Sequence, residues 1–264
     1  MEQGKSSDKR RIAIEIEYDG TRYNGWQIQN GGRTVQGEIE RAIAVLTREQ
    51  SRTVASGRTD SGVHALGQIA HFDTGSAISL QRFCIGLNGI LPKDISVKNA
   101  YRVHDGFHAR FDAIERRYRY LIFNHPCRSP FMMYRSLWVH ERLDTDYLAA
   151  VTRQLIGEKD FSSFCKKRES KKITTVRRIT DITVQRNGDM ICLEITGNAF
   201  LHNMIRIIVG TIVEMDRNKA EPSVLAEIVS RRDRDFSGVT APPYGLYLVR
   251  VLYDPDLALA ESAF

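Results

Sequence analysis

The order of apolar patterns in the first part of the chain is the feature that most constrains the fold. Residues 11–18 alternate apolar and polar side chains with a period of two, which is typical of a strand. Residues 34–48 instead repeat apolar side chains along one helical face. Strand-like segments at 54–55, 68–73 and 95–103 and a helical segment at 80–91 complete the set. The resulting order, strand, helix, strand, strand, helix, strand, predicts a ferredoxin-like antiparallel sheet with two helices on one side.

The second half of the chain repeats this order with insertions. The predicted elements are a strand from Arg116, a helix at 144–156, a hairpin of 173–185 and 190–196 across the turn RNGD, a helix at 201–215, a smaller helix after Pro222 and a strand at 246–253. We therefore expect an α+β protein of two ferredoxin-like (RRM-like) βαββαβ domains, whose mostly antiparallel sheets meet at a central cleft. The expected boundaries are a flexible tail at 1–10, an N-terminal domain at 11–104 and a C-terminal domain at 105–264.

Composition narrows the class of protein and its partners. Apolar residues make up 42% of the 264 residues, which is enough for an ordinary packed core. Lysine and arginine total 38 against 32 aspartates and glutamates, so an anionic partner such as nucleic acid is favoured. The four cysteines lie apart without a CxxC pair, which argues against zinc or a disulfide framework and favours the cytoplasm. We expect no signal peptide and no membrane span, because no apolar run approaches the roughly 20 residues that a span needs.

A polar loop at 57–64 carries a single carboxylate, Asp60, between Gly57 and Gly62. Polar residues between glycines ordinarily form a hairpin connection, and spacing alone predicts nothing more. The motifs DSG at 60–62 and DTG at 73–75 also match the aspartic protease pattern as a minor alternative. They lie too close in sequence to come from two lobes, although a dimer using one copy from each chain is compatible with them.

Several other polar residues have both a possible functional role and an ordinary structural explanation. HDGFH at 104–108 has the histidine spacing of a zinc helix, but Asp105 and Gly106 argue against a metal there. Arg206 lies on an apolar face of the helix at 201–215, so its guanidinium needs an anionic partner unless it reaches solvent. The loop KKRESKK is either solvated or follows a phosphate backbone, and Arg110 is a similar, weaker case. The lysines of this loop that we expect to bind substrate are Lys166, Lys167, Lys171 and Lys172.

Several segments together resemble one known family. GRTDSGVHA at 57–65, followed by GQIAHF, closely resembles the active-site motif of the TruA-type tRNA pseudouridine synthases. The resemblance continues in the family's order through IEYDGTRYNGWQIQ at 16–29, DGFHARFDAIERRYRYLIFN at 105–124, DFSSF at 160–164, NAFLHNMIRIIVGTIVE at 198–214 and GLYL at 245–248. It covers nearly the whole chain, although KKRESKK is more basic than is typical of that region.

This resemblance implies an enzyme that isomerises uridine to pseudouridine at nucleotides 38, 39 and 40 of the tRNA anticodon stem-loop. The implied reaction is base flipping, aspartate attack, cleavage of the N1 glycosidic bond and reattachment of the ribose at C5. It also implies a homodimer that uses no cofactor and no metal. The alternative from another class is a noncatalytic RNA-binding protein on duplicated RRM-like domains. No aromatic RNP1 run supports that alternative, and binding alone does not need the carboxylate of Asp60.

The resemblance also implies roles for single residues. Asp60 matches the catalytic aspartate, which acts at ribose C1′, at the uracil ring, or by removing a ribose proton. Tyr118 matches the tyrosine that packs against the flipped base, and Arg206 matches the basic residue that pairs with the aspartate. Leu246 matches an apolar residue of the base pocket, and Arg58 matches the arginine that helps to displace the base from its stack.

Overall fold

The computed structural model describes residues 9–167, 173–257 and 261–263. The chain divides into two compact units. The first comprises the residues up to Ile114 together with those from Arg250 onward, and the second comprises Glu115–Val249. Both contain mostly antiparallel strands together with helices, which confirms the predicted mixed α+β class. None of the helices in the described ranges is long and apolar enough to cross a bilayer.

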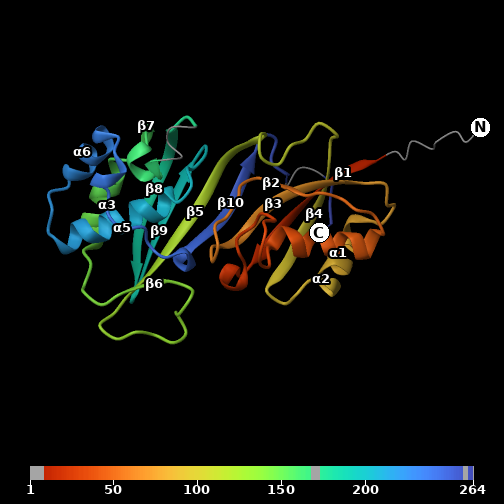
Figure 1. Ribbon diagram of the computed structural model, residues 1–264, viewed down its shortest axis with the longest axis horizontal. Coiled ribbons are helices and arrows are strands. Elements are labelled where there is room, and N and C mark those ends of the chain that lie inside the picture. Colours follow the sequence, from red (N-terminus) through yellow and green to blue (C-terminus); the bar gives the residue numbers. More distant parts are fainter. Residues whose placement is uncertain (1–8, 168–172, 258–260, 264) are drawn as a thin grey trace, which may run out of the picture. The chain divides into compact units, whose positions relative to one another are not determined.

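The first unit follows the predicted element order. Its elements are β1 (Arg10–Tyr18), α1 (Val35–Thr47), β2 (Val54–Ala55), β3 (His64–Thr74), α2 (Leu80–Ile90), β4 (Ile95–Val103) and the short β11 (Glu261–Ser262). Across the sheet the strands run β11-β4-β1-β3, and β2 pairs with β3. All of these pairings are antiparallel. Helices α1 and α2 lie next to each other on the same side of the sheet (Figure 1).

Local sequence explains where these elements begin and end. The apolar stripe of β1 is fully buried at Ile12, Ile14 and Ile16. Helix α1 begins after Thr34, whose hydroxyl accepts a hydrogen bond from the backbone N–H of Gly37, and it ends at Arg48 in the left-handed region. The predicted patterns located β1, β2, β4, α1 and α2 to within a residue, because capping and periodicity are local properties of the chain. The strand predicted at 68–73 is longer in the structure, since β3 already begins at His64.

The second unit contains more elements than the sequence pattern predicted. They are β5 (Ala113–Asn124), β6 (Leu137–Val139), α3 (Thr145–Arg153), β7 (Gly157–Asp160), β8 (Val176–Asn187), β9 (Met190–Gly197), α5 (Met204–Arg217), α6 (Val224–Arg231) and β10 (Leu246–Tyr253). The sheet order is β10-β5-β9-β8-β7, and β6 runs parallel to β5. The short strands β6 and β7 were not predicted, since they are too short to show a clear two-residue period.

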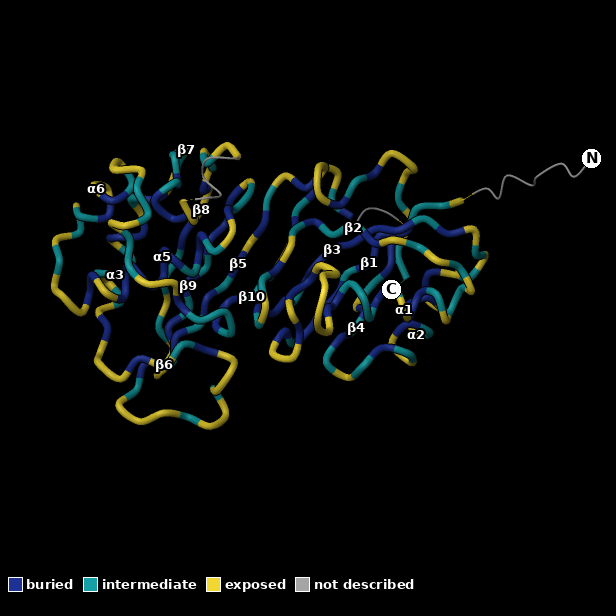
Figure 2. Tube along the Cα trace, viewed as in Figure 1, coloured by how far each residue is buried: buried dark blue, intermediate teal, exposed yellow. Residues whose placement is uncertain are grey.

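Several predicted elements of the second unit have different bounds in the structure; the strand predicted at 173–185, for example, is β8 at Val176–Asn187. Helix α5 begins at Met204 instead of 201, because Asn203 has a φ of 62° and cannot continue a helical turn. Most of the helix is buried, including Ile208, Val209 and Val213, which are each 5% exposed or less. Figure 2 shows α5 largely in the colour of buried residues, in contrast to the exposed connecting loops around it.

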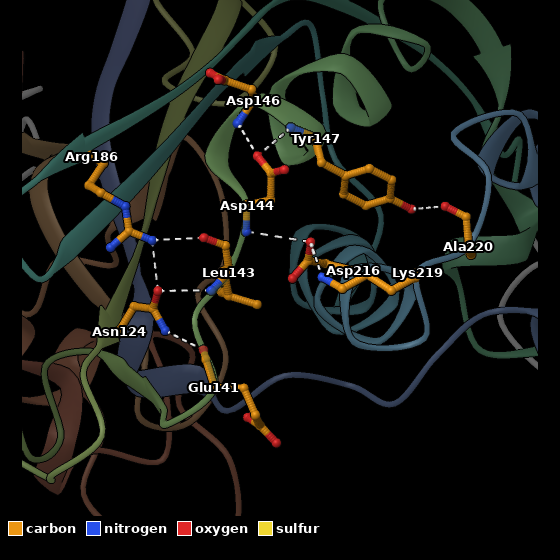
Figure 3. Close-up of polar contacts among 10 residues, drawn as sticks. All are labelled: Asn124, Glu141, Leu143, Asp144, Asp146, Tyr147, Arg186, Asp216, Lys219 and Ala220. Carbon is orange, nitrogen blue, oxygen red and sulfur yellow. Dashed lines mark hydrogen bonds and ion pairs between the residues drawn. The ribbon is translucent and has the colours of Figure 1, made fainter.

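A polar network joins the start of α3 to its neighbours (Figure 3). Asp144 caps α3, because its carboxylate accepts hydrogen bonds from the N–H groups of Asp146 and Tyr147. Asn124 at the end of β5 accepts from the guanidinium of Arg186 at 2.7 Å and from the N–H of Leu143 at 3.1 Å. These bonds tie both ends of the connection between β5 and α3 to the sheet of the second unit.

Candidate active site

The loop that carries Asp60, residues 57–64, is held within the first unit by bonds to its own flanks. The carbonyl of Gly57 accepts from the side-chain amide of Gln68 at 2.8 Å, and the hydroxyl of Ser56 bonds the same side chain at 2.6 Å. On the other side of Asp60, the N–H of Val63 donates to the Asp60 carbonyl at 3.1 Å, which closes a tight turn. Gly62 in this turn has a φ of 79°, a backbone conformation that glycine adopts without steric cost.

The segment at 19–26, here called the clasp, wraps this Asp60 loop. Its Trp26 N–H donates to the carbonyl of Thr59 at 3.1 Å, and its Tyr23 carbonyl accepts from the N–H of Gly62 at 3.3 Å. The same carbonyl accepts from the hydroxyl of Ser61 at 3.2 Å. The clasp therefore bonds the residue before Asp60 and the two residues after it, so the backbone of Asp60 is fixed from both sides.

Close backbone approach makes two clasp glycines necessary. A Cβ on Gly25 would lie 2.5 Å from the Thr59 carbonyl oxygen, and one on Gly20 would lie 2.0 Å from the Val63 carbonyl oxygen. The N–H of Gly20 donates to the Nδ1 atom of His64 at 3.1 Å, and His64 is only 1% exposed. The sequence placed His64 at the turn without a role, and the structure makes it a buried acceptor for the clasp.

Asp73 of the DTG motif is engaged elsewhere in the first unit. Its two carboxylate oxygens accept from Nε and Nη2 of Arg11 at 2.7 and 2.8 Å, which lowers the pKa of Asp73. It lies near the end of β3, whereas Asp60 lies four residues before His64, the first residue of that strand, which is 11 residues long. At about 3.3 Å per residue the strand holds the two carboxylates of one chain far apart. They therefore do not form a protease dyad within the chain.

Tyr118 and Leu246 lie in the second unit on β5 and at the start of β10. Tyr118 is 9% exposed, and its ring meets that of Phe200 edge to face with centroids 5.2 Å apart. Tyr120, two residues along the same strand face, is fully buried and its hydroxyl donates to the carbonyl of Pro242 at 2.8 Å. A Cβ on Gly245 would lie 2.7 Å from the Tyr120 ring, so β10 can begin at Leu246 only after a glycine.

Arg206 lies in the first turn of α5 and is half-buried. Its Nε donates to the carbonyl of Ala241 at 2.8 Å, and its Nη1 donates to the side chain of Asn203 at 2.6 Å. The backbone carbonyl of Arg206 in turn accepts from the Ala241 N–H at 3.0 Å. These bonds fix the position of the Arg206 side chain. They also show that neutral oxygens of the second unit accept hydrogen bonds from two of its three guanidinium nitrogens.

The other basic candidates that the structure describes are exposed. Arg58 and Arg110 lie at the surface of the first unit, with the Arg110 guanidinium 5.8 Å from the ring centre of Phe111. Lys166 is exposed, whereas the ammonium of Lys167 lies 2.9 Å from Asp233 and 2.5 Å from Asp235. Lys171 and Lys172 lie outside the described residues.

The HDGFH motif forms a turn in the first unit. The Nδ1 atom of His108 accepts from the N–H groups of Arg110 and Phe111 at 3.2 Å, and its ring stacks on Phe111 at 4.2 Å. His108 therefore has a structural role, because its side chain accepts the hydrogen bonds that stabilise this turn. Within residues 9–167, 173–257 and 261–263, no three His, Cys, Asp or Glu side chains gather as they would around a metal ion.

Sequence reasoning missed the clasp as a functional element. The run IEYDGTRYNGWQIQ contributes only to the family resemblance, which implies no role for Tyr23, Gly25 or Trp26. The available signal was the density of glycines in that run, which indicates close backbone approach. What the glycines approach is visible only in the folded chain.

Comparisons with known proteins agree with these observations. The family model described as tRNA pseudouridine synthase matches residues 14–112 and 151–254, so the matched parts contain Asp60, Arg206 and Leu246, while Tyr118 lies between them. A tRNA pseudouridine synthase A from Methylococcus capsulatus is 42% identical over 253 residues, which cover 96% of this chain and 93% of its own. The protein of the same name from Acetivibrio thermocellus is 44% identical over 244 residues, or 92% of this chain and 100% of its own. This chain belongs to the tRNA pseudouridine synthase family.

Proposed function

We propose that this protein isomerises uridine to pseudouridine in tRNA, at nucleotides 38, 39 and 40 of the anticodon stem-loop. In this reaction the C1′–N1 bond breaks, a C1′–C5 bond forms, a proton leaves C5 and N1 takes up a proton. Atoms and electrons balance without an oxidant or reductant. The proposal includes no cofactor and no metal, as the resemblance to the TruA type implies. Family membership supports the reaction class, and the resemblance of the Asp60 loop and its neighbours to the TruA type supports the choice of nucleotides.

The single observation that carries the proposal is the Asp60 loop itself. Its carboxylate belongs to a residue whose neighbours Thr59, Ser61 and Gly62 all bond the clasp. Precise positioning of a reacting group lowers the barrier of a reaction, whereas a simple hairpin connection needs no such support. We propose Asp60 as the catalytic residue, acting at ribose C1′, at the uracil ring, or on a ribose proton.

The other site residues are proposed to act on the same uridine. Arg58 helps to displace the base from its stack, which costs a few kcal/mol. Tyr118 offers an aromatic face to the flipped base, Leu246 lines the base pocket, and Arg206 pairs with the carboxylate of Asp60. The exposed lysines Lys166 and Lys167, the loop residues Lys171 and Lys172, and Arg110 contact the phosphate backbone.

We also propose the architecture and setting in which this reaction takes place. The strand orders β4-β1-β3-β2 and β10-β5-β9-β8 support a ferredoxin-like fold for each unit. The domain limits that we propose from the sequence are 11–104 and 105–264, which differ from the bounds of the two compact units. We propose that the protein works as a homodimer in the cytoplasm, where its tRNA substrate is found.

The test is a comparison of Asp60→Asn with the wild-type protein on unmodified tRNA. Tritium at C5 of uridine is released only if C5 loses its proton, so its release measures turnover. We expect Asp60→Asn to bind tRNA with unchanged affinity and to release no tritium above background. Asp146→Asn, which changes an exposed aspartate of α3, is the matched control and should react normally. Wild-type turnover by Asp60→Asn would remove the catalytic assignment and favour the noncatalytic RNA-binding alternative.

A further inference from the structure

The clasp is itself held by one buried side chain. Tyr23 is 1% exposed, and its hydroxyl donates to the carboxylate of Asp94 at 2.5 Å. Asp94 makes a second bond to the clasp, because its carbonyl accepts from the N–H of Asp19 at 3.0 Å. The guanidinium of Arg33 lies 5.0 Å from the centre of the Tyr23 ring, on which it forms a cation–π contact. Asp94 and Arg33 thus fix the position of the Tyr23 ring and hydroxyl.

Tyr23 also bonds the Asp60 loop directly, on the C-terminal side of Asp60. Its backbone carbonyl accepts from both the Gly62 N–H and the Ser61 hydroxyl. A shift of its phenol ring would therefore move the acceptor that fixes the two residues after Asp60. Tyr23 therefore links the Asp94 carboxylate, which its hydroxyl contacts, to the Asp60 loop, which its backbone carbonyl contacts.

The sheet of the first unit does not depend on this arrangement. Strand β1 is paired with β3 and with β4 by backbone bonds along nearly its whole length, from Arg10 or Arg11 to Tyr18. The clasp begins after Tyr18 and lies outside these ladders. Loosening the clasp should then disturb the Asp60 loop more than it disturbs the fold.

We propose that the Tyr23–Asp94 hydrogen bond is a positioning device for the reaction, which holds the Asp60 carboxylate in its reactive place through the Tyr23 carbonyl. Tyr23 and Asp94 are positioning residues and do not touch the substrate. The inference rests on the proposed function, since it assigns these residues to the reaction of Asp60. It predicts an effect on the rate of the chemical step and little effect on tRNA binding.

Three variants distinguish the effect of the Tyr23–Asp94 hydrogen bond from the effects of the Asp94 charge and of side-chain size. Tyr23→Phe removes only the hydroxyl, Asp94→Ala removes the acceptor, and Asp94→Asn removes the charge but keeps an oxygen that accepts from Tyr23. We expect Tyr23→Phe and Asp94→Ala to lower kcat about ten- to hundredfold with KM for tRNA changed less than about twofold, because misplacement by about 1 Å has effects of this size. Asp94→Asn should keep most of the wild-type kcat. The double variant Tyr23→Phe with Asp94→Ala should be no slower than the slower single variant, since both remove one interaction.

The same unit supplies a matched control. The hydroxyl of Tyr101 on β4 donates to the carboxylate of Glu15 on β1 at 2.9 Å, and Tyr101 is 7% exposed. Tyr101→Phe therefore removes an equivalent phenol–carboxylate bond away from the Asp60 loop. We expect it to lower Tm about as much as Tyr23→Phe does and to leave kcat unchanged.

Amide hydrogen exchange gives a readout that does not depend on activity. The Gly62 and Val63 amides should exchange at least about tenfold faster in Tyr23→Phe than in Tyr101→Phe. Equal exchange rates, or a kcat for Tyr23→Phe equal to that of Tyr101→Phe, would overturn the proposal. If Tyr23→Phe does not fold, the pair Asp94→Asn and Asp94→Ala makes the same comparison, and equal kcat values for these two would overturn it. Failure of the wild-type protein to release tritium would instead remove the proposed function, while the exchange comparison would still decide whether Tyr23 anchors the loop.

Discussion

Replacing Gly25 by alanine should disable the protein with little change in its overall fold. Gly25 has a φ of 81°, and its Cα faces the backbone of the Asp60 loop. A Cβ built there would lie 2.5 Å from the carbonyl oxygen of Thr59 and 3.1 Å from the carbonyl carbon of Asp60. Both neighbours are backbone atoms that cannot rotate away, so the clasp or the Asp60 loop has to move.

The size of the effect follows from the distances. Ordinary contact with a Cβ begins at 3.4 Å, so the Thr59 carbonyl must retreat by roughly 1 Å. Displacing a reacting group by about 1 Å can cost on the order of a hundredfold in rate. The positive φ adds a backbone penalty of about 1–2 kcal/mol for alanine in the folded state. We therefore expect Gly25→Ala to lower kcat about a hundredfold.

Gly31→Ala is the matched control for this substitution. Gly31 has a φ of 82°, and a Cβ on it would meet nothing within 4 Å. It carries the same backbone penalty without the contact to the Asp60 loop, so it should lose about 1–2 kcal/mol of stability and keep its kcat. Tritium release under saturating tRNA measures kcat, and chemical denaturation measures stability. A Gly25→Ala variant as active as Gly31→Ala would refute the claim that the clasp sets the position of Asp60.

Two further predictions concern pH and salt. Burial, followed by the charge of Arg11, lowers the pKa of His71 from 6.5 to about 4, so the unfolded chain takes up a proton between these values and the folded chain does not. The free energy of unfolding should fall as the pH drops from 6.5 toward 4, by at most about 3 kcal/mol. His71→Asn should remove this contribution from a plot of the free energy of unfolding against pH. A plot with the same slope for the variant and the wild-type protein would contradict this account. Lys166→Ala should reduce the salt dependence of tRNA binding more than Lys167→Ala, because Lys167 is already paired with Asp233 and Asp235. A larger effect for Lys167→Ala in the plot of log Kd against log salt would show that it leaves these carboxylates for RNA.

Much of the fold could be predicted because its signals are local. The two-residue period of β1 and the apolar stripe of α1 placed both elements almost to the residue. The turn RNGD predicted the hairpin of β8 and β9, in which Asn187 pairs with Met190 and Gly188 has a φ of 58°. The apolar residues around the helix at 201–215 predicted its burial. Failures occurred where no period exists, as in the short strand β7 and at Asn203, whose left-handed backbone delays the start of α5.

The sequence predicted the candidate active site only in part. Local pattern alone described residues 57–64 as a hairpin connection, and the family resemblance singled out Asp60 among several polar residues there. The same resemblance gave roles to Tyr118, Arg206 and Leu246, and these roles stay predictions. The carboxylate of Asp73, which matched a protease motif as well as Asp60 did, proved to be paired with Arg11 across the β1–β3 ladder.

What the sequence by itself determined is the order of the elements, their approximate bounds and, through resemblance, the family. What only the tertiary structure decided is how the Asp60 loop is held. Tyr23 bonds Ser61 across 38 residues of chain, and the hydroxyl of Tyr23 reaches Asp94 across 71 residues. Such contacts use backbone carbonyls and single side chains, which carry no periodic signal in the sequence. They form only when the strands that flank them have paired, so their partners are set by the folded sheet and cannot be read from the local pattern.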